Sequence, residues 1–107
     1  MKNKCRKVCV ILVNRANYGR MRPVMNAIKS EPNLKMQLIC CGAMLLERFG
    51  KAIDLVASDG FQIDSQIHME VEGGQPQTMS KSVGLGIIEF TSEFERLAPD
   101  IVLVIGD

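Results

Sequence analysis

Three stretches of the chain are almost purely apolar. Residues 8–13 and 101–105 contain only Val, Ile, Leu and Cys, and residues 36–41 include a single Gln among apolar residues. Short runs of this kind, rich in β-branched side chains, are typical of strands buried on both faces of a parallel sheet. The pattern therefore predicts three buried strands, of which the last lies at the end of the chain.

Three other segments carry apolar residues at every third or fourth position, which predicts amphipathic helices. The first helix is expected to start near Met21, because Pro23 is best tolerated in a first turn, and to end before Pro32. The second helix is expected to cover residues 45–56. The third, with the most regular spacing, is expected to cover residues 78–97.

Residues 61–69 alternate between apolar and polar positions, which predicts a half-exposed strand near a sheet edge. His68, the only histidine of the chain, falls on the polar side and is expected to face solvent. Strands and helices then alternate along the whole sequence. This order predicts an α/β fold, namely a Rossmann-like parallel sheet with flanking helices and right-handed crossovers.

Composition narrows the class of protein. A length of 107 residues has room for one domain, and 13 Lys and Arg against 12 Asp and Glu give a net charge of +1. Such a balance argues against a nucleic-acid binder. No stretch approaches the roughly 20 apolar residues of a membrane span, and the run after the basic N-terminus is too short for a signal peptide. We therefore expect a cytoplasmic protein with neither nucleic acid nor membrane as partner.

The four cysteines do not suggest a metal site. Cys5 and Cys9 are separated by three residues, and Cys40 and Cys41 are adjacent, which is not a zinc-binding spacing. Thiols stay reduced in the cytoplasm. We expect Cys9 and Cys40 to be small buried residues of strands, and no metal to be bound.

Candidate chemistry lies where the first and last strands end. Ligands of doubly wound sheets bind beyond the carboxyl ends of the strands, where the strand order reverses. The usual order 3-2-1-4 would place the last strand beside the first and bring Arg15 and Asp107 to one edge of the sheet. Arg15, between a strand and a helix, could bind phosphate. Asp107 could act as an acid or base.

Both residues also have a purely structural interpretation. Arg15 could be a solvated loop residue, and Asp107 could cap a following helix. The loop that contains Arg15 has a single glycine, Gly19, so it matches neither GxGxxG nor GxxxxGK[ST].

Several motifs carry a family resemblance. Residues 14–19, Asn-Arg-Ala-Asn-Tyr-Gly, resemble the N-R-A-[DN]-Y-[GS] turn of hydrolysing UDP-N-acetylglucosamine 2-epimerases. Residues 99–107 resemble the P-D-hydrophobic-G-D-R segment of that family. Further matches are Ile-Lys-Ser-Glu-Pro at 28–32, Phe-Gln-Ile-Asp at 61–64, Val-Glu-Gly at 71–73 and Ser-Val-Gly-Leu at 82–85. The similarity extends from about Val8 to Asp107.

The resemblance implies a glycosyltransferase-B-like architecture, in which two Rossmann-like domains enclose the active site. It implies conversion of UDP-N-acetylglucosamine to N-acetylmannosamine and UDP for sialic-acid synthesis, by elimination of UDP and then hydration, with no obligatory cofactor or metal. Arg15 would touch the UDP, Gly19 would line the same nucleotide site, and Asp107 would be an acid or base near the sugar. The intact protein is expected to be a homo-oligomer.

The family is several hundred residues long. We therefore expect residues 1–107 to be an incomplete N-terminal Rossmann-like domain, without the second domain and inactive alone. Two alternatives stay open. One is a non-catalytic nucleotide-binding or receiver-like module, although a receiver would need acidic residues after the first strand, where Asn14, Arg15 and Asn17 stand. The other is half of a glycosyltransferase, which fold alone cannot separate from an epimerase; the turn at residues 14–19 favours the epimerase.

Overall fold

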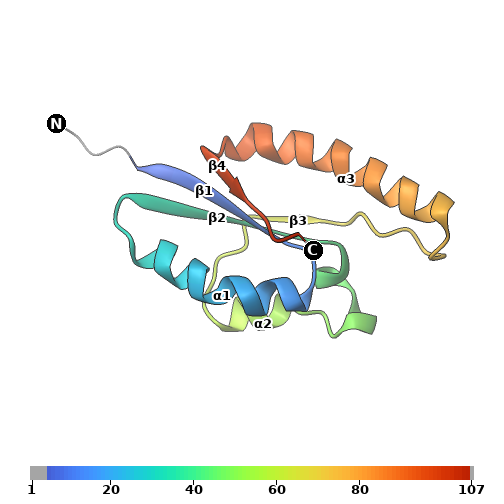
Figure 1. The fold of residues 1–107 in the computed structure, drawn as a ribbon, viewed down its shortest axis with the longest axis horizontal. Helices are drawn as coiled ribbons and strands as arrows, with labels where there is room; N and C mark the ends of the chain where they lie inside the picture. The colour runs from blue at the N-terminus through green and yellow to red at the C-terminus, as the bar shows by residue number, and fades with distance from the viewer. Residues whose placement is uncertain (1–4, 107) are drawn as a thin grey trace.

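A four-stranded parallel sheet forms the centre of the computed structural model, which describes residues 5–106 (Figure 1). Its order is β3-β2-β1-β4, as the sequence predicts. Val8 of β1 pairs with Met36 of β2 on one side and Ile101 of β4 on the other. The strands are β1 (Arg6–Leu12), β2 (Leu34–Cys41), β3 (Ser65–Ile67) and β4 (Ile101–Leu103).

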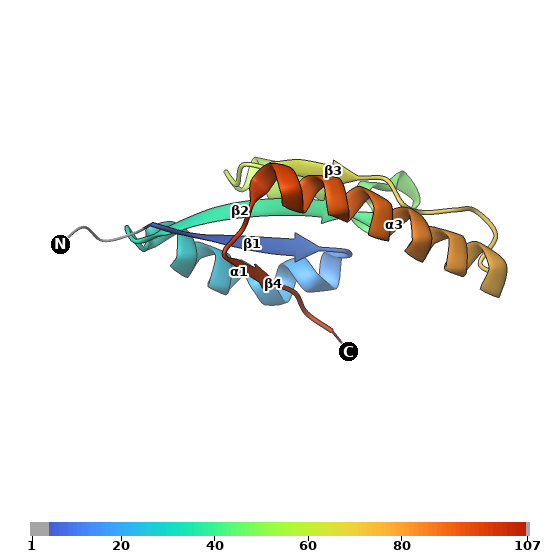
Figure 2. The same ribbon diagram turned by 90° about the horizontal axis from the view of Figure 1, so that it is seen from above.

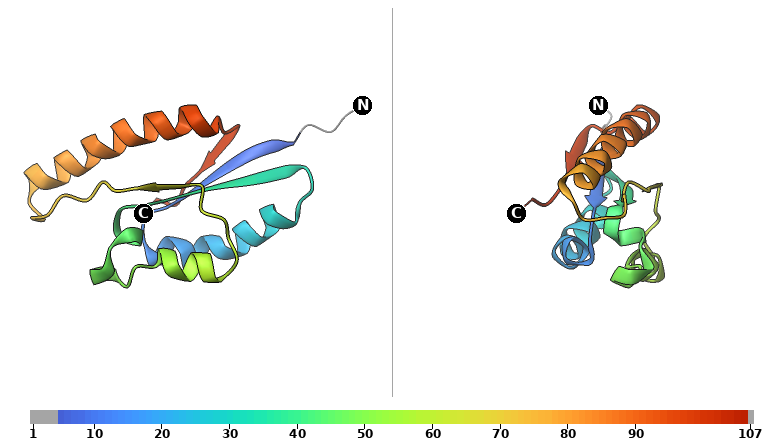
Figure 3. Two further views of the ribbon diagram at one scale, coloured as in Figure 1. Left: turned by 180° about the vertical axis from the view of Figure 1, so that it is seen from behind. Right: turned by 90° about the vertical axis from the view of Figure 1, so that its right-hand side faces the viewer.

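Helices cover both faces of the sheet. Helices α1 (Arg15–Ser30) and α2 (Ile53–Ser58) lie on one face, and α3 (Pro76–Leu97) lies on the other (Figures 1 and 3). The connections from β1 to β2 and from β2 to β3 step in one direction along the sheet, and the connection from β3 to β4 steps back. Crossovers of one handedness then place α3 on the opposite face. The predicted α/β class is confirmed.

Helix α1 begins six residues earlier than predicted. Its N-cap is Asn14, whose Oδ1 accepts a hydrogen bond from the backbone N–H of Asn17 at 2.9 Å. Pro23 therefore lies inside the helix rather than in its first turn. The prediction of a start near Met21 was wrong because a side-chain cap upstream outweighs the local cost of an exposed proline.

The predicted continuous helix over residues 45–56 is also wrong. Two 3-10 turns, η1 (Gly42–Leu45) and η2 (Glu47–Phe49), precede the short helix α2. The break follows from two consecutive left-handed residues, Gly50 with φ 81° and Lys51 with φ 44°. The helical spacing was therefore partly coincidental.

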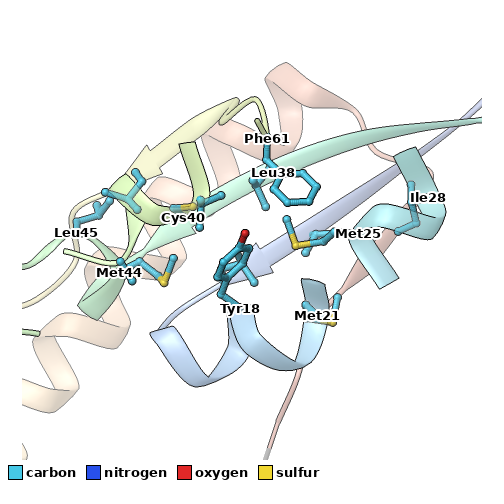
Figure 4. Packing of buried hydrophobic residues seen from close by; sticks show 14 of the residues in the cluster. Tyr18, Met21, Met25, Ile28, Leu38, Cys40, Met44, Leu45 and Phe61 are labelled. Atoms are coloured by element: carbon cyan, nitrogen blue, oxygen red, sulfur yellow. The ribbon is translucent and has the colours of Figure 1, made fainter. Parts of the chain in front are cut away.

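The main core lies between the sheet and the helices α1 and α2. Tyr18 and Met25 of α1 pack toward Leu38 and Cys40 of β2, with Phe61 beside them (Figure 4). The Tyr18 hydroxyl donates to the Asp59 carboxylate at the end of α2, which ties the two helices together. A hydroxyl on a buried ring needs such a partner, because an unpaired buried donor is costly.

The cysteines and the single histidine lie as predicted. Cys9 and Cys40 are fully buried within strands, Cys41 is buried beside them, and Cys5 is exposed. His68 is exposed just after the edge strand β3.

Helix α3 is confirmed, and its apolar contacts with the second core cluster come from its second half. It starts at Pro76, two residues before the predicted start, and Phe90, Phe94 and Leu97 pack against the second core cluster. The first turns extend beyond the carboxyl end of the sheet (Figure 2), and Met79 is 62% exposed. That second cluster consists of Cys9, Ile11, Ile39, Cys41 and Ile67. Among the described residues no helix is long and apolar enough to span a membrane.

Candidate functional site

The loops that follow β1 and β2 meet at the carboxyl edge of the sheet. The backbone N–H of Met44 donates to the carbonyl of Val13 at 3.1 Å, which joins the two loops directly. Gly42 has φ 57°, and a Cβ at this position would lie 3.2 Å from Glu70 Oε1 and 3.4 Å from Val13 Cγ1. The close contact therefore favours glycine both for its backbone angle and for its size.

Arg15 is the first residue of α1, and a double asparagine turn holds the backbone on either side of it. Asn14 caps the helix as described, and the Oδ1 of Asn17 accepts a hydrogen bond from the backbone N–H of Val13 at 3.1 Å. Asn17 is buried and Arg15 is exposed. The guanidinium thus adds its charge to the positive end of a 16-residue helix, an arrangement that favours an anion.

A pocket of about 430 Å³ lies at this position. It is lined by Asn14, Arg15 and Ala16 from the start of α1, by Ala43 after β2, and by Phe49 of η2. Its volume falls in the range of about 300–1,000 Å³ that is usual for small-molecule sites. The pocket combines one cation, helix N–H groups and one aromatic side chain, which is suited to a ligand with an anionic group beside a ring.

A second, more polar pocket of about 290 Å³ lies nearby on the side of α3. Arg48, Glu70 and Ser82 are among its lining residues. The Arg48 Nη1 lies 3.2 Å from both carboxylate oxygens of Glu72, so η2 is tied to the loop after β3. Such an exposed pair adds little stability but orients the two loops.

The thiols below this edge are unsuited to nucleophilic catalysis. Burial raises the pKa of Cys40 to about 12, and burial with the nearby Glu70 charge raises the pKa of Cys41 to about 11. Both side chains stay protonated near neutral pH, and only a thiolate is a strong nucleophile.

The three predicted site residues have different outcomes in the structure. Arg15 lies at the predicted edge of the sheet and lines the pocket. Gly19 lies one turn further along α1, with no atom within 4 Å of a Cβ built on it, and it is not among the pocket residues. Asp107 lies outside the described residues.

Sequence reasoning did not single out Ala43 and Phe49 as site residues. Their signal was available in the glycines Gly42 and Gly50, which adjoin them and mark turns after a strand end. No three His, Cys, Asp or Glu side chains within residues 5–106 converge as a metal ion would require.

Known proteins resemble this chain over nearly its whole length. A 2-epimerase from Legionella pneumophila, named UDP-N,N'-diacetylbacillosamine 2-epimerase (hydrolyzing), is 29% identical over 102 residues. The UDP-N-acetylglucosamine 2-epimerase of Neisseria meningitidis is 22% identical over 102 residues. The two alignments cover 95% of this chain but only 27% and 26% of those proteins, so the chain spans about a quarter of their length.

Structural comparison agrees on the fold. A crystal structure of UDP-N-acetylglucosamine 2-epimerase superposes with a TM-score of 0.78 and 19% identity, over 97% of this chain and 27% of that one. The fold is thus the Rossmann-like part of a glycosyltransferase-B-like architecture. The family profile described as UDP-N-acetylglucosamine 2-epimerase matches residues 26–107. Because this match covers most of the sequence, the chain belongs to the UDP-N-acetylglucosamine 2-epimerase family.

Proposed function

We propose that the protein acts as a hydrolysing UDP-N-acetylglucosamine 2-epimerase, which releases UDP and N-acetylmannosamine for sialic-acid synthesis. The observation that carries this proposal is the position of Arg15, which lies between the two asparagines that hold the start of α1 and lines a pocket at the carboxyl edge of the sheet. A guanidinium at a helix N-terminus is suited to the diphosphate of a nucleotide sugar.

The proposed reaction has two steps. A base removes the proton on C2 of the sugar while the bond from C1 to the UDP oxygen breaks, which leaves a C1=C2 double bond and free UDP. Water then adds its oxygen to C1, and a proton reaches C2 from the opposite face, which inverts C2. Arg15 would stabilise the negative charge on the departing diphosphate, and Asp107 would act as an acid or base near the sugar. We also propose that Gly19 lies near the nucleotide.

The active protein is proposed to be larger than this chain. Residues 1–107 correspond to about a quarter of the family members described above. We propose that they form part of the first of two Rossmann-like domains, that the second domain is needed to hold the nucleotide, and that the 107-residue chain alone does not turn over. We expect the full-length protein to work in the cytoplasm as a homo-oligomer.

A second candidate substrate is UDP-N,N'-diacetylbacillosamine. The observation in its favour is the name of two relatives, from Legionella pneumophila and Campylobacter jejuni, that are each 29% identical to this chain over 102 residues. Both candidate substrates carry a nucleotide and an acetylated amino sugar. Comparing kcat/KM for the two substrates with the full-length protein decides between them.

Replacing Arg15 tests the proposed role of the pocket. In the full-length protein, Arg15→Ala should raise the KM for the UDP-sugar by about tenfold or more, because a charge-assisted bidentate contact is worth roughly 1.5–3 kcal/mol. Arg15→Lys should recover part of the loss, since lysine keeps the charge but not the fork. Arg20→Ala, on the same helix but outside the pocket, is the control. Unchanged binding by Arg15→Ala would remove Arg15 from the site.

Asp107 is tested by Asp107→Asn in the same protein. If Asp107 moves a proton, turnover should fall by about 100-fold or more while the unfolding midpoint stays unchanged. Near-normal turnover would mean that Asp107 only caps or positions a neighbouring segment.

A further inference from the structure

Phe49 is an unusual residue for the edge of this site. Its side chain belongs to the residue class that is most often buried, yet it is 54% exposed. It lines the same pocket as Arg15, at the carboxyl edge of the sheet. A large aromatic side chain held in solvent beside a cation suggests a surface that a ligand covers.

The turn around Phe49 is rigidly built. The carbonyl of Leu46 accepts hydrogen bonds from the backbone N–H groups of Phe49 at 3.2 Å and Lys51 at 2.9 Å, and the carbonyl of Glu47 accepts one from Gly50 at 2.8 Å. Lys51 adopts φ 44°, a left-handed conformation that costs a residue with a Cβ roughly 1–2 kcal/mol. Strained backbone of this kind is found preferentially at ligand sites. The left-handed backbone of Gly50 and Lys51 thus directly follows the exposed Phe49 in the chain.

Two guanidinium groups lie close to this turn. The Arg48 Cζ lies 5.0 Å from the centre of the Phe49 ring, and Arg48 is held by both carboxylate oxygens of Glu72. Arg15 Nη1 lies 4.0 Å from the position of a Cβ on Gly50, the residue after Phe49. Cationic groups thus adjoin a flat apolar surface. A diphosphate next to a ring has the complementary chemistry.

We propose that Phe49 is a substrate-binding residue, on whose ring one flat ring of the nucleotide sugar stacks while the diphosphate faces Arg15. This inference rests on the proposed function, because it takes the ligand to be a nucleotide sugar. The stacked ring is either the C–H face of the pyranose or the π face of the uracil. Both present the flat, weakly polar surface that an aromatic side chain binds.

The test measures binding and turnover of the full-length protein with Phe49→Ala, Phe49→Tyr and Phe49→Leu. Phe49→Ala should raise the KM for UDP-N-acetylglucosamine about tenfold and change kcat less than about threefold, as expected for a contact made equally in the ground and transition states. Phe49→Tyr should bind like the wild type, and Phe49→Leu should lie between. Ile88→Ala, which shortens an exposed apolar side chain of α3 outside the pocket, is the matched control.

Calorimetric titration with UDP, which lacks the pyranose, shows whether the pyranose or the uracil stacks on Phe49. If Phe49→Ala lowers the affinity for UDP-N-acetylglucosamine but not the affinity for UDP, the pyranose stacks on Phe49. If the affinities for both ligands fall equally, the uracil stacks on Phe49. If neither affinity changes while the wild type binds both, the proposal is overturned and the proposed function stands. A wild type that binds neither ligand would overturn the proposed function itself, which keeps the two failures distinct.

Discussion

At the scale of single residues, the turn after β1 contains one arginine and two asparagines that have different roles. Arg15 could be predicted as a ligand-binding candidate because its position between a strand and a helix is visible in the sequence. The roles of Asn14 and Asn17 could not, because asparagine is common in any turn and only the backbone angles show which side chain caps. Asp107 stays a prediction.

The asparagine turn should be measurable as stability. Asn14→Ala removes the acceptor of the Asn17 N–H and should lower the free energy of unfolding by about 1 kcal/mol in urea titration. Asn14→Ser should keep most of the stability, because serine also caps. Asn26→Ala, at an exposed position inside the same helix, should not destabilise. Equal stability of Asn14→Ala and wild type would show that the cap has no energetic role.

The buried thiols give a prediction on reactivity and pH. Burial raises the pKa values of Cys9 and Cys41 to about 11 and of Cys40 to about 12, from 9.0 in the unfolded chain. Because the folded pKa values are higher, their contribution to stability is present below pH 9 and is lost as the pH rises toward 11 to 12.

Maleimide labelling at pH 8 followed by peptide mass spectrometry measures this protection. Cys5 should be modified within minutes, whereas Cys9, Cys40 and Cys41 should react only after denaturation. Rapid labelling of Cys40 in the native protein would contradict the buried strand β2.

At the scale of elements, spacing alone predicted the third helix well and the second poorly. Helix α3 follows an apolar stripe that is regular from Met79 to Leu97, so its existence did not depend on any single position. The segment of residues 45–56 has the same spacing over fewer turns, and Gly50 and Lys51 end the regularity with left-handed backbone. A glycine within a short helical pattern of apolar residues is compatible with a continuous helix or with a break in it. Tertiary contacts decide which of the two forms.

The proline inside helix α1 should lower the stability of the protein. Pro23 lacks the N–H that would bond to the carbonyl of Gly19, and its ring crowds that carbonyl. Pro23→Ala should therefore raise the free energy of unfolding by about 1–3 kcal/mol, and Pro23→Gly should raise it by roughly 1 kcal/mol less. Urea or thermal unfolding measures the difference. Lower stability of Pro23→Ala would mean that α1 is shaped around the proline.

At the scale of the whole molecule, the strand order 3-2-1-4 was predictable because it is the usual order in half of a doubly wound sheet. What the sequence could not show is how much of α3 and β4 is covered. Ile87 and Val83 of α3 are 65% and 58% exposed, and Ile101 and Val102 of β4 are also exposed. The spacing of apolar residues does not show which of their side chains are buried, because burial depends on neighbouring residues from elsewhere in the fold.

This apolar surface should bind a hydrophobic dye. The double substitution Val83→Lys and Ile87→Lys should lower the fluorescence of bound anilinonaphthalene sulfonate at least about twofold, while the free energy of unfolding changes by less than about 1 kcal/mol, since exposed positions tolerate polar residues. Val24→Lys, at an exposed apolar position of α1, should leave most of the signal. Unchanged fluorescence of the double variant would place the dye site elsewhere.

The chemistry proposed for the full-length protein is tested most directly by following UDP-N-acetylglucosamine in D₂O by proton NMR. We expect UDP and N-acetylmannosamine that carries one deuterium at C2, because the C2 proton leaves before a solvent proton is added from the other face. The proposed elimination would be contradicted by N-acetylglucosamine that retains its C2 proton, which a simple hydrolysis would give, or by an intact nucleotide sugar.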